Sequence, residues 1–173
     1  KTFLASRIVK STNVFGYDYQ LEHLIAKLVR GLWEASHGQL GLSAPPALIA
    51  GRPVSFARAD GPEDDAYAEA RLRGAFKAAG FDEVEFVYEP VAAALHYEAT
   101  LERDETVLVA DFGGGTSDFC LLHVGPSHRA NVRDPARILG TRGVGVAGDN
   151  LDMRIVQHLV APVLGAGSLY KTM

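Results

Sequence analysis

Eight consecutive residues in the second half of the chain combine two acids, three glycines and two hydroxyl side chains: Asp111-Phe112-Gly113-Gly114-Gly115-Thr116-Ser117-Asp118. Successive glycines remove every Cβ atom that would hold a ligand away from the backbone. They also permit positive φ angles, so neighbouring N–H groups can converge on an anion. A hairpin needs only about two residues at its turn, so this triple glycine exceeds what turning requires. We therefore predict that Gly113, Gly114 and Gly115 bind phosphate.

The carboxylates beside this turn indicate a cation as well. A carboxylate repels bare phosphate, whereas a divalent cation placed between the two groups attracts both. Mg²⁺ keeps several of its waters when it binds to a protein, so we expect Asp111 to hold the metal through water. The turn is thus expected to bind a phosphate group together with its metal ion.

Hydrophobic patterns predict the elements that must position this turn. Residues 107–110 are typical of a strand buried on both faces, which places Asp111 at its end, and residues 116–124 of a second strand. Further elements are expected as a helix over 18–36, a strand over 47–50, a helix from Pro62 to Ala79, a strand over 84–88, a helix from Glu89 to about Ala99, an extended segment over 138–146 and a helix over 149–164. This alternation of helices and strands predicts an α/β protein.

Helical periodicity also predicts which side chains face the core. The residues expected to lie inward are Leu24, Ile25, Leu28, Val29, Leu32 and Trp33 in the first helix, Ala68, Leu72, Ala75, Phe76 and Ala79 in the second, and Leu151, Ile155, Val156, Leu159 and Val163 in the last. Each helix is therefore expected to dock one face on a neighbour.

Composition restricts the class of protein. The chain has 173 residues, of which 47% are hydrophobic and 22% charged, enough for one ordinary core or two small ones. A net charge of −4 gives no electrostatic reason to expect nucleic acid or an anionic membrane as a partner. The apolar runs are too short to span a bilayer, and Cys120 is the single cysteine. We therefore expect a cytoplasmic protein.

The glycine motifs are also compatible with two other classes of nucleotide-binding protein. Asp111-Phe112-Gly113 also spells the magnesium-binding triplet of protein kinases, but a kinase would carry a His-Arg-Asp catalytic loop about two dozen residues upstream. The chain has Tyr88-Glu89-Pro90-Val91 there instead. The glycines of 143–148 lack the spacing of a dinucleotide fingerprint, although Gly148 and Asp149 fit a helix N-terminus that faces a phosphate.

Three motifs, in this order, resemble the nucleotide-binding domain of the seventy-kilodalton heat-shock chaperones, a family of the actin-like ATPase superfamily. They are Glu89-Pro90-Val91-Ala92-Ala93-Ala94-Leu95, the turn motif from Asp111 to Asp118, and Gly148-Asp149-Asn150-Leu151-Asp152. The sequence departs from the family at Gly51-Arg52-Pro53-Val54, at Ala147, where the family has a glycine, and at Ser117, where an aromatic residue is common. The chain is therefore similar to a divergent, bacterial heat-shock-like chaperone.

The resemblance implies an actin-like ATPase (ribonuclease H-like) fold, in which a mixed sheet is flanked by helices. Residues 1–100 would form the C-terminal part of lobe I with its crossing helix, and residues 101–173 the N-terminal part of lobe II. The first phosphate loop and the adenosine-binding segment of the family are not found in this sequence. We therefore expect an incomplete two-lobe domain that is inactive as an ATPase by itself.

The resemblance also assigns roles to residues. Asp111 would bind the water shell of Mg²⁺, and Glu89 would orient the attacking water or a metal-bound water. Thr116 would place its hydroxyl near the γ-phosphate, and Gly148 and Asp149 would contact the nucleotide beside the three glycines. The family's catalytic lysine would correspond to Lys1 of Lys1-Thr2-Phe3-Leu4-Ala5, although a solvated lysine without a catalytic role fits this position equally. The implied cofactors are ATP or ADP and Mg²⁺.

Three functions follow from the resemblance as alternatives. The first is an ATP-hydrolysing chaperone switch, whose partners in the full-length protein would be an unfolded polypeptide or a co-chaperone. The second is a kinase of the same superfamily that phosphorylates a small metabolite such as a sugar or acetate. The third is a module that senses nucleotide without catalysis. Glu89, Asp111 and Thr116 are all present, which favours a catalytic role.

Overall fold

The computed structural model describes residues 2–41, 47–131 and 134–167 of the chain. It begins with an antiparallel hairpin of β1 (Ser11–Val14) and β2 (Tyr17–Gln20), which leads into α1 (Leu21–Leu40). The prediction that this helix starts at residue 18 is wrong, because Tyr17–Gln20 pairs with β1 instead. The helix also continues past Gly38 and ends at Gly41, whose φ of 66° is left-handed, as is common at a helix C-terminus.

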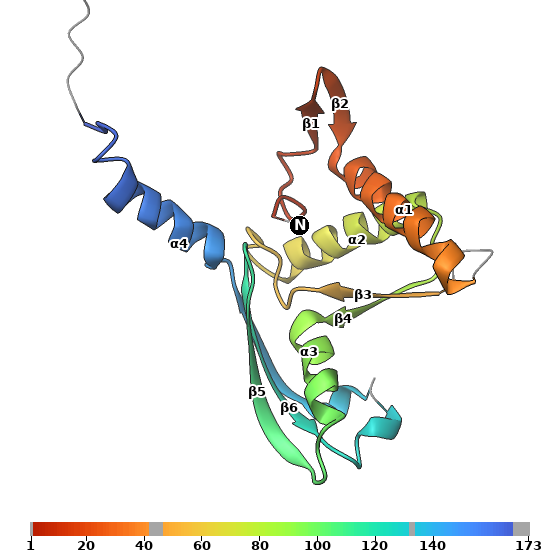
Figure 1. Cartoon of the computed structure of the whole chain (residues 1–173). Coiled ribbons are helices and arrows are strands. Elements are labelled where there is room, and N and C mark those ends of the chain that lie inside the picture. The colour runs from red at the N-terminus through yellow and green to blue at the C-terminus, as the bar shows by residue number, and fades with distance from the viewer. Residues whose placement is uncertain (1, 42–46, 132–133, 168–173) are drawn as a thin grey trace, which may run out of the picture.

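A parallel pair of strands organises the first half of the chain. Strands β3 (Leu48–Arg52) and β4 (Val84–Tyr88) pair in register, and α2 (Pro62–Ala78) connects them. Helices α1 and α2 lie on the same side of this pair (Figure 1). Proline and three acids start α2 as predicted, since acids in the first turn interact favourably with the helix dipole.

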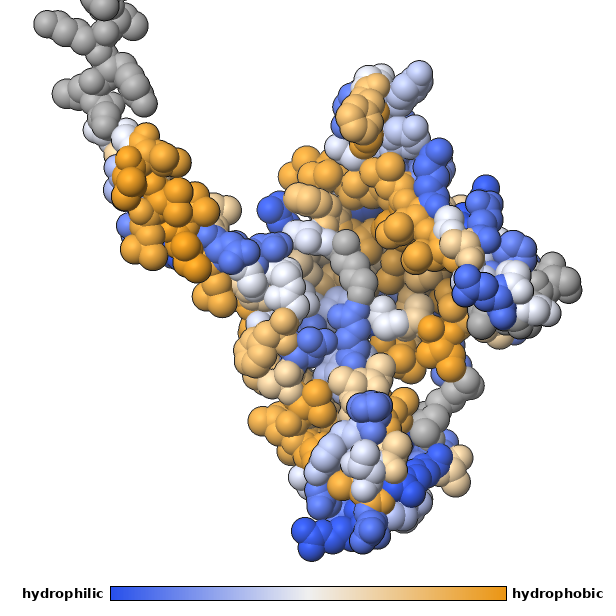
Figure 2. All heavy atoms as spheres, in the orientation of Figure 1, coloured by the Kyte–Doolittle hydropathy of each residue, from blue (hydrophilic) through white to orange (hydrophobic). Residues whose placement is uncertain are grey.

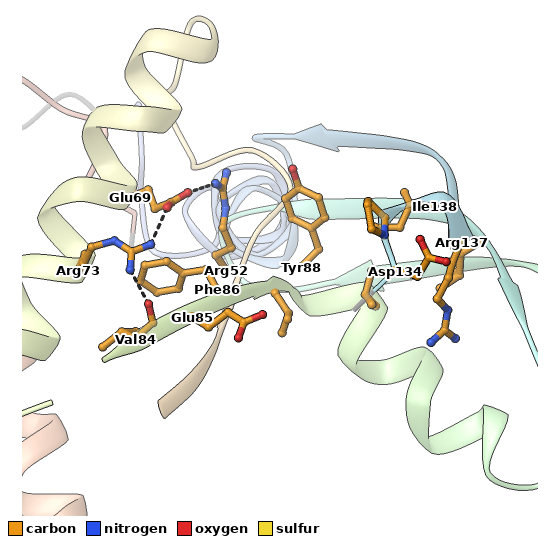
Figure 3. A pocket seen from close by; sticks show the side chains of 14 residues that line it. Arg52, Glu69, Arg73, Val84, Glu85, Phe86, Tyr88, Asp134, Arg137 and Ile138 are labelled. Carbon is orange, nitrogen blue, oxygen red and sulfur yellow. Dashed lines mark hydrogen bonds and ion pairs between the residues drawn. The ribbon is translucent and has the colours of Figure 1, made fainter. Parts of the chain in front are cut away.

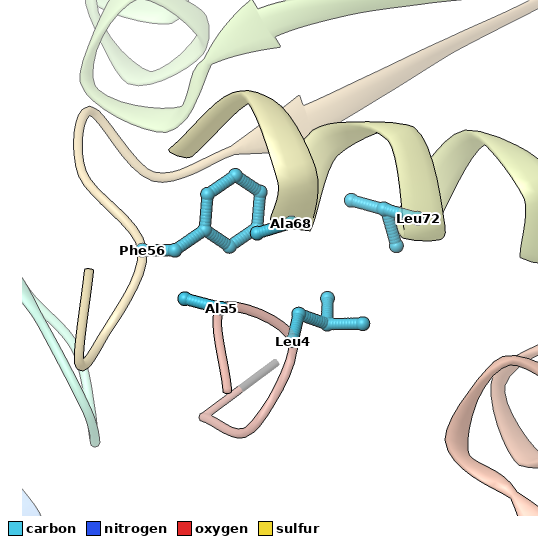
Figure 4. Packing of buried hydrophobic residues seen from close by; sticks show 5 residues of the cluster. All are labelled: Leu4, Ala5, Phe56, Ala68 and Leu72. Atoms are coloured by element: carbon cyan, nitrogen blue, oxygen red, sulfur yellow. The ribbon is translucent and has the colours of Figure 1, made fainter. Parts of the chain in front are cut away.

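Two small apolar clusters hold this half together. The first consists of Leu4, Ala5, Phe56, Ala68 and Leu72 and joins the N-terminal turn to α2 (Figure 4). The second contains Ala26 of α1, Ala50 of β3 and Phe81 after α2. The inward face predicted for α2 is confirmed, but that of α1 is wrong at Leu28 and Leu32, which are 65% and 63% exposed. Their neighbours Val29 and Trp33 pack against the second cluster instead.

An antiparallel sheet organises the second half. Helix α3 (Glu89–Glu98) follows β4 directly and packs on the sheet of β5 (Glu105–Phe112), β6 (Ser117–Val124) and β7 (Ile138–Val144), in the order β5-β6-β7. The expectation that β5 is buried on both faces is wrong, since its exposure alternates and Leu108 is 65% exposed. Only the face turned toward α3 is covered by described residues.

The last elements leave the sheet. Short helices η1 (Arg129–Asn131) and η2 (Pro135–Arg137) connect β6 to β7, which ends two residues earlier than predicted. Helix α4 (Gly148–Ile155) and the short π-helix η3 (Val156–Val160) then extend away from the rest of the chain (Figure 1).

The inward face predicted for the last helix is wrong. Hydrophobic residues gather over its surface (Figure 2), and those expected to be inward are exposed in the part of the chain that the structure describes: Leu151, Ile155, Val156, Leu159 and Val163. Amphipathic periodicity identified the helix but not its neighbour. No helix among the described residues is long and apolar enough to cross a membrane.

Candidate phosphate-binding site

The glycine turn between β5 and β6 is a closed loop. The Gly113 N–H donates to the Thr116 carbonyl at 2.9 Å, directly beyond the last paired residues of the two strands. Among the described residues, no group accepts a hydrogen bond from the N–H of Gly114 or Gly115. Adjacent unpaired N–H groups on a glycine turn are a suitable site for an anion.

The start of α4 holds this turn in shape. The N–H groups of Gly148 and Asp149 donate to the carbonyls of Gly113 and Gly114, at 3.0 and 2.8 Å. A Cβ atom added to Gly148 would lie 3.2 Å from the Gly113 carbonyl oxygen, so this approach of two backbones favours glycine. Because these two N–H groups are used by the turn, a contact of Gly148 or Asp149 with the nucleotide stays a prediction.

Asp118 is the buried acid of the site. It is 1% exposed, and its two carboxylate oxygens accept different hydrogen bonds. The Val54 N–H donates to Oδ1 at 2.9 Å, and the Thr116 hydroxyl donates to Oδ2 at 2.9 Å. Asp118 therefore connects the glycine turn to the loop that follows β3.

Burial raises the pKa of the Asp118 carboxyl above its ordinary value. The hydrogen bonds from Thr116, Val54 and Ser55 lower this pKa, while the negative charge of Glu89 raises it further. The net upward shift means that burial disfavours the charged form of this carboxyl group.

Glu89 begins α3 immediately before Pro90. Its Cγ atom lies 3.1 Å from where a Cβ atom of Gly51 would be, so the side chain lies against the end of β3. A larger residue at position 51 would displace it. The parallel pair therefore brings the carboxyl end of β3 and the start of α3 to the same edge, the usual place for ligands in open α/β sheets.

The loop after β3 is fixed on its other side by α2. The Phe56 N–H donates to Asp65 Oδ1 at 2.6 Å, and the Ser55 hydroxyl lies 3.1 Å from Asp65 Oδ2. Gly143 of β7 lies against the same loop, since a Cβ atom there would be 2.7 Å from the Ser55 nitrogen. Strands β6 and β7 thus contact the loop directly.

The structure gathers most of the predicted site residues around the turn. Asp111 pairs in register with Asp118, Thr116 contacts Asp118, and a Cβ atom added to Gly115 would lie 3.4 Å from the Thr2 hydroxyl oxygen. Lys1 lies outside the described residues, and its role stays a prediction. Within the described ranges, no three His, Cys, Asp or Glu side chains are placed to hold a metal ion directly.

Asp118 is the residue of the site that the sequence interpretation did not assign. Its position in the sequence could have indicated that it is buried. Cys120, Leu122 and Val124 follow it at every second residue, and all three are buried. The strand period of two places Asp118 on the same face. An acid in phase with a buried apolar face points to a specific hydrogen-bonding role.

A pocket among the described residues lies elsewhere. It has a volume of about 520 Å³ and lies between β4, α2 and η2, and Figure 3 shows the side chains that line it. Arg52, Arg73 and Arg137 line it beside Glu69, Glu85 and Asp134, so positive and negative side chains are equal in number. None of the predicted phosphate-binding residues lines it, and the turn remains the better candidate.

Fold and site together describe an α/β protein with a backbone site for phosphate. Comparison with known proteins gives the family: a sequence model described as "Hsp70 protein" matches residues 64–164. The chain belongs to the Hsp70 family, whose members share the actin-like ATPase fold. The helices and the parallel and antiparallel strands described above agree with that class.

Curated relatives are named "Chaperone protein dnaK". The protein from Gracilaria tenuistipitata var. liui is 30% identical over 161 residues, which cover 92% of this chain and 23% of the relative. Those from Cyanidium caldarium and Emiliania huxleyi are each 32% identical, covering 83% and 84% of this chain and 21% of either relative. The chain spans about a fifth of the length of these relatives. The similarity supports a chaperone nucleotide-binding domain in general terms.

Proposed function

We propose that this chain forms the phosphate-holding part of an ATP-hydrolysing nucleotide-binding domain in an Hsp70-type chaperone. One observation carries the proposal: the start of α4 holds the Gly113–Thr116 turn, two of its N–H groups have no partner among the described residues, and the Asp118 carboxylate accepts the Thr116 hydroxyl beside it. This combination suits a polyphosphate that is bound together with a cation.

The residues around the turn fit ATP and Mg²⁺. A glycine turn without Cβ atoms leaves room for phosphate oxygens against the backbone, and Asp111 and Glu89 supply oxygen ligands at its margin. Because Mg²⁺ keeps several of its waters in proteins, Asp111 would hold the metal through water. When bound, Mg²⁺ would neutralise charge that develops on the phosphoryl oxygens.

The remaining residues would position the attacking water. In this proposal Glu89 accepts a hydrogen bond from that water and orients it in line with the γ-phosphate. The Thr116 hydroxyl donates its proton to Asp118, so its oxygen is left as an acceptor. An acceptor there suits a water molecule on the metal better than a phosphate oxygen.

We further propose that residues 1–100 belong to lobe I and 101–173 to lobe II of the ribonuclease H-like fold. A polypeptide client, a co-chaperone and a cytoplasmic location are proposals that rest on the family alone. Membership in the Hsp70 family favours this reading over a small-metabolite kinase.

The test is ATP hydrolysis by the full-length protein with Mg²⁺, comparing wild type with Asp111→Ala. Loss of a preorganised electrostatic group lowers turnover by about a hundredfold or more. Asp82→Ala, which removes the same charge at an exposed position before β4, is the matched control and should hydrolyse ATP like wild type.

Added substrates separate the alternatives. Stimulation by an unfolded peptide supports the chaperone, while turnover that needs a sugar or an acid acceptor points to the metabolite kinase. Nucleotide binding without turnover would leave a sensing module and contradict the proposal.

A further inference from the structure

Arg52 is the last residue of β3, at the point where the sequence departs from the family's usual strand ending. Its side chain is only 12% exposed. The guanidinium lies over the rings of Phe56 and Tyr88, 5.1 and 5.3 Å from their centroids, and forms an ion pair with Glu69 of α2 (Figure 3). Aromatic faces and a carboxylate therefore fix this cation in one orientation.

The same guanidinium binds the backbone that follows it. Nε donates to the Pro53 carbonyl at 3.1 Å, and Nη2 donates to the Val54 carbonyl at 3.3 Å. With Nη1 on Glu69, three nitrogens of one planar group are used by three acceptors. A lysine has a single ammonium group and cannot reproduce this fork.

The bond to Pro53 determines where the next N–H points. The Pro53 carbonyl and the Val54 N–H belong to one planar trans peptide unit, so they point in opposite directions. Arg52 holds the carbonyl end, and the N–H end donates to Asp118 Oδ1 at 2.9 Å. The other oxygen of Asp118 accepts the Thr116 hydroxyl.

We propose that Arg52 is a positioning residue for ATP hydrolysis, which orients the Pro53–Val54 peptide toward Asp118 and thereby fixes the Thr116 hydroxyl at the phosphate turn. The inference rests on the proposed function of that turn. Three hydrogen bonds connect Arg52 to Thr116. Arg52 donates to the Pro53 carbonyl, the Val54 N–H of the same peptide unit donates to Asp118, and the Thr116 hydroxyl donates to the other oxygen of Asp118.

The matched control is Arg73 of α2. It carries the same charge, also pairs with Glu69 and also stacks on a ring, that of Phe86 at 4.8 Å. Its remaining hydrogen bond goes to the Val84 carbonyl and not to the loop after β3. Arg73→Met therefore removes a comparable set of contacts without releasing the Pro53–Val54 peptide.

The experiment uses the full-length protein and two readouts. The first is amide hydrogen exchange at Val54, which does not depend on activity, and the second is ATP turnover with kcat and KM separated. In Arg52→Met we expect exchange at Val54 to quicken and kcat to fall, each by about tenfold, the factor that one hydrogen bond is worth. KM for ATP should stay within about twofold, since Arg52 does not touch the nucleotide site.

Arg73→Met should leave exchange at Val54 and kcat unchanged. Arg52→Lys keeps the positive charge but loses the planar three-nitrogen group, so it tests whether that group is required. We expect it to behave like Arg52→Met, and it replaces that variant if Arg52→Met does not fold. Equal exchange at Val54 in the Arg52 variants and Arg73→Met would overturn the inference. So would a quickened exchange with unchanged kcat, or full rescue by lysine. If wild type fails to hydrolyse ATP, the proposed function falls, and the exchange comparison still decides whether Arg52 orients the peptide.

Discussion

Gly143 of β7 is a position where one methyl group should disturb both stability and the site. It stands opposite Asp118 in the sheet register. A Cβ atom at Gly143 would lie 2.7 Å from the Ser55 nitrogen, 2.8 Å from Asp118 Oδ1 and 2.9 Å from the Ser55 Cβ atom. None of these atoms is the free end of a flexible side chain, so Gly143→Ala must move the loop after β3 or the strand.

The size of the effect follows from these contacts. Overpacking a tight site costs about 1–3 kcal/mol. If the loop lifts away, the bond from Val54 to Asp118 is lost as well, at about 1 kcal/mol. We therefore expect Gly143→Ala to lower the free energy of unfolding by about 2–4 kcal/mol and to reduce ATP turnover.

Gly140 provides the control on the same strand. A Cβ atom there meets nothing within 4 Å, so Gly140→Ala should change stability by no more than about 0.5 kcal/mol. The assay is urea unfolding of the full-length protein, followed by the midpoint of the transition in which this domain unfolds. If the two variants unfold within about 0.5 kcal/mol of each other, the close approach of β7 to the loop does not constrain residue 143, and the reasoning is refuted.

Two further predictions concern ion pairs. Glu98 and Arg137 form an ion pair at 2.6 Å, and their side chains are 3% and 2% exposed. Arg137→Met should lower the free energy of unfolding by about 3–5 kcal/mol, because the buried Glu98 carboxylate keeps only the hydrogen bond from the Gly125 N–H. The double variant Glu98→Leu/Arg137→Met should recover most of this loss in the same unfolding assay. The hydrogen bond from Arg71 lowers the pKa of Glu22 below its ordinary 4.5. A carboxyl group whose pKa is lower in the folded than in the unfolded state stabilises the fold at any pH above its unfolded pKa. This stabilisation is lost as the pH falls through the folded-state pKa. The difference in melting temperature between wild type and Glu22→Gln should therefore be full at pH 7 and shrink below about pH 4.5; a difference independent of pH would contradict this.

Elements with local signals were predicted well from the sequence. Proline and acids at the start of α2, the apolar run of β4 and the Glu89-Pro90 start of α3 act within a few residues of the element they define. The errors come from pairing between distant segments. Residues 17–20 form a strand only because β1 lies opposite them, and the exposure of Leu108 depends on which face of the sheet α3 covers.

The candidate site divides in the same way. The glycine turn has a signature of eight consecutive residues, so its position between two strands could be predicted from sequence alone and is confirmed. The bond from Val54 to Asp118 joins residues 64 positions apart, and no local pattern marks it. The orientation of the Pro53–Val54 peptide by Arg52 is likewise visible only in three dimensions.

Asp118 explains how two halves with separate apolar clusters share one site. Its backbone belongs to the β5–β6–β7 sheet, while its Oδ1 atom is hydrogen bonded to the loop that leaves β3. Because the carboxylate is buried, water cannot replace a donor that moves away, and each lost hydrogen bond leaves charge uncompensated. A displacement of the loop relative to the sheet would therefore strain the hydrogen bond to Asp118. It would also shift Thr116, whose hydroxyl donates to the same carboxylate. The geometry of the phosphate turn thus depends on the relative position of the two halves and not on the glycine motif alone.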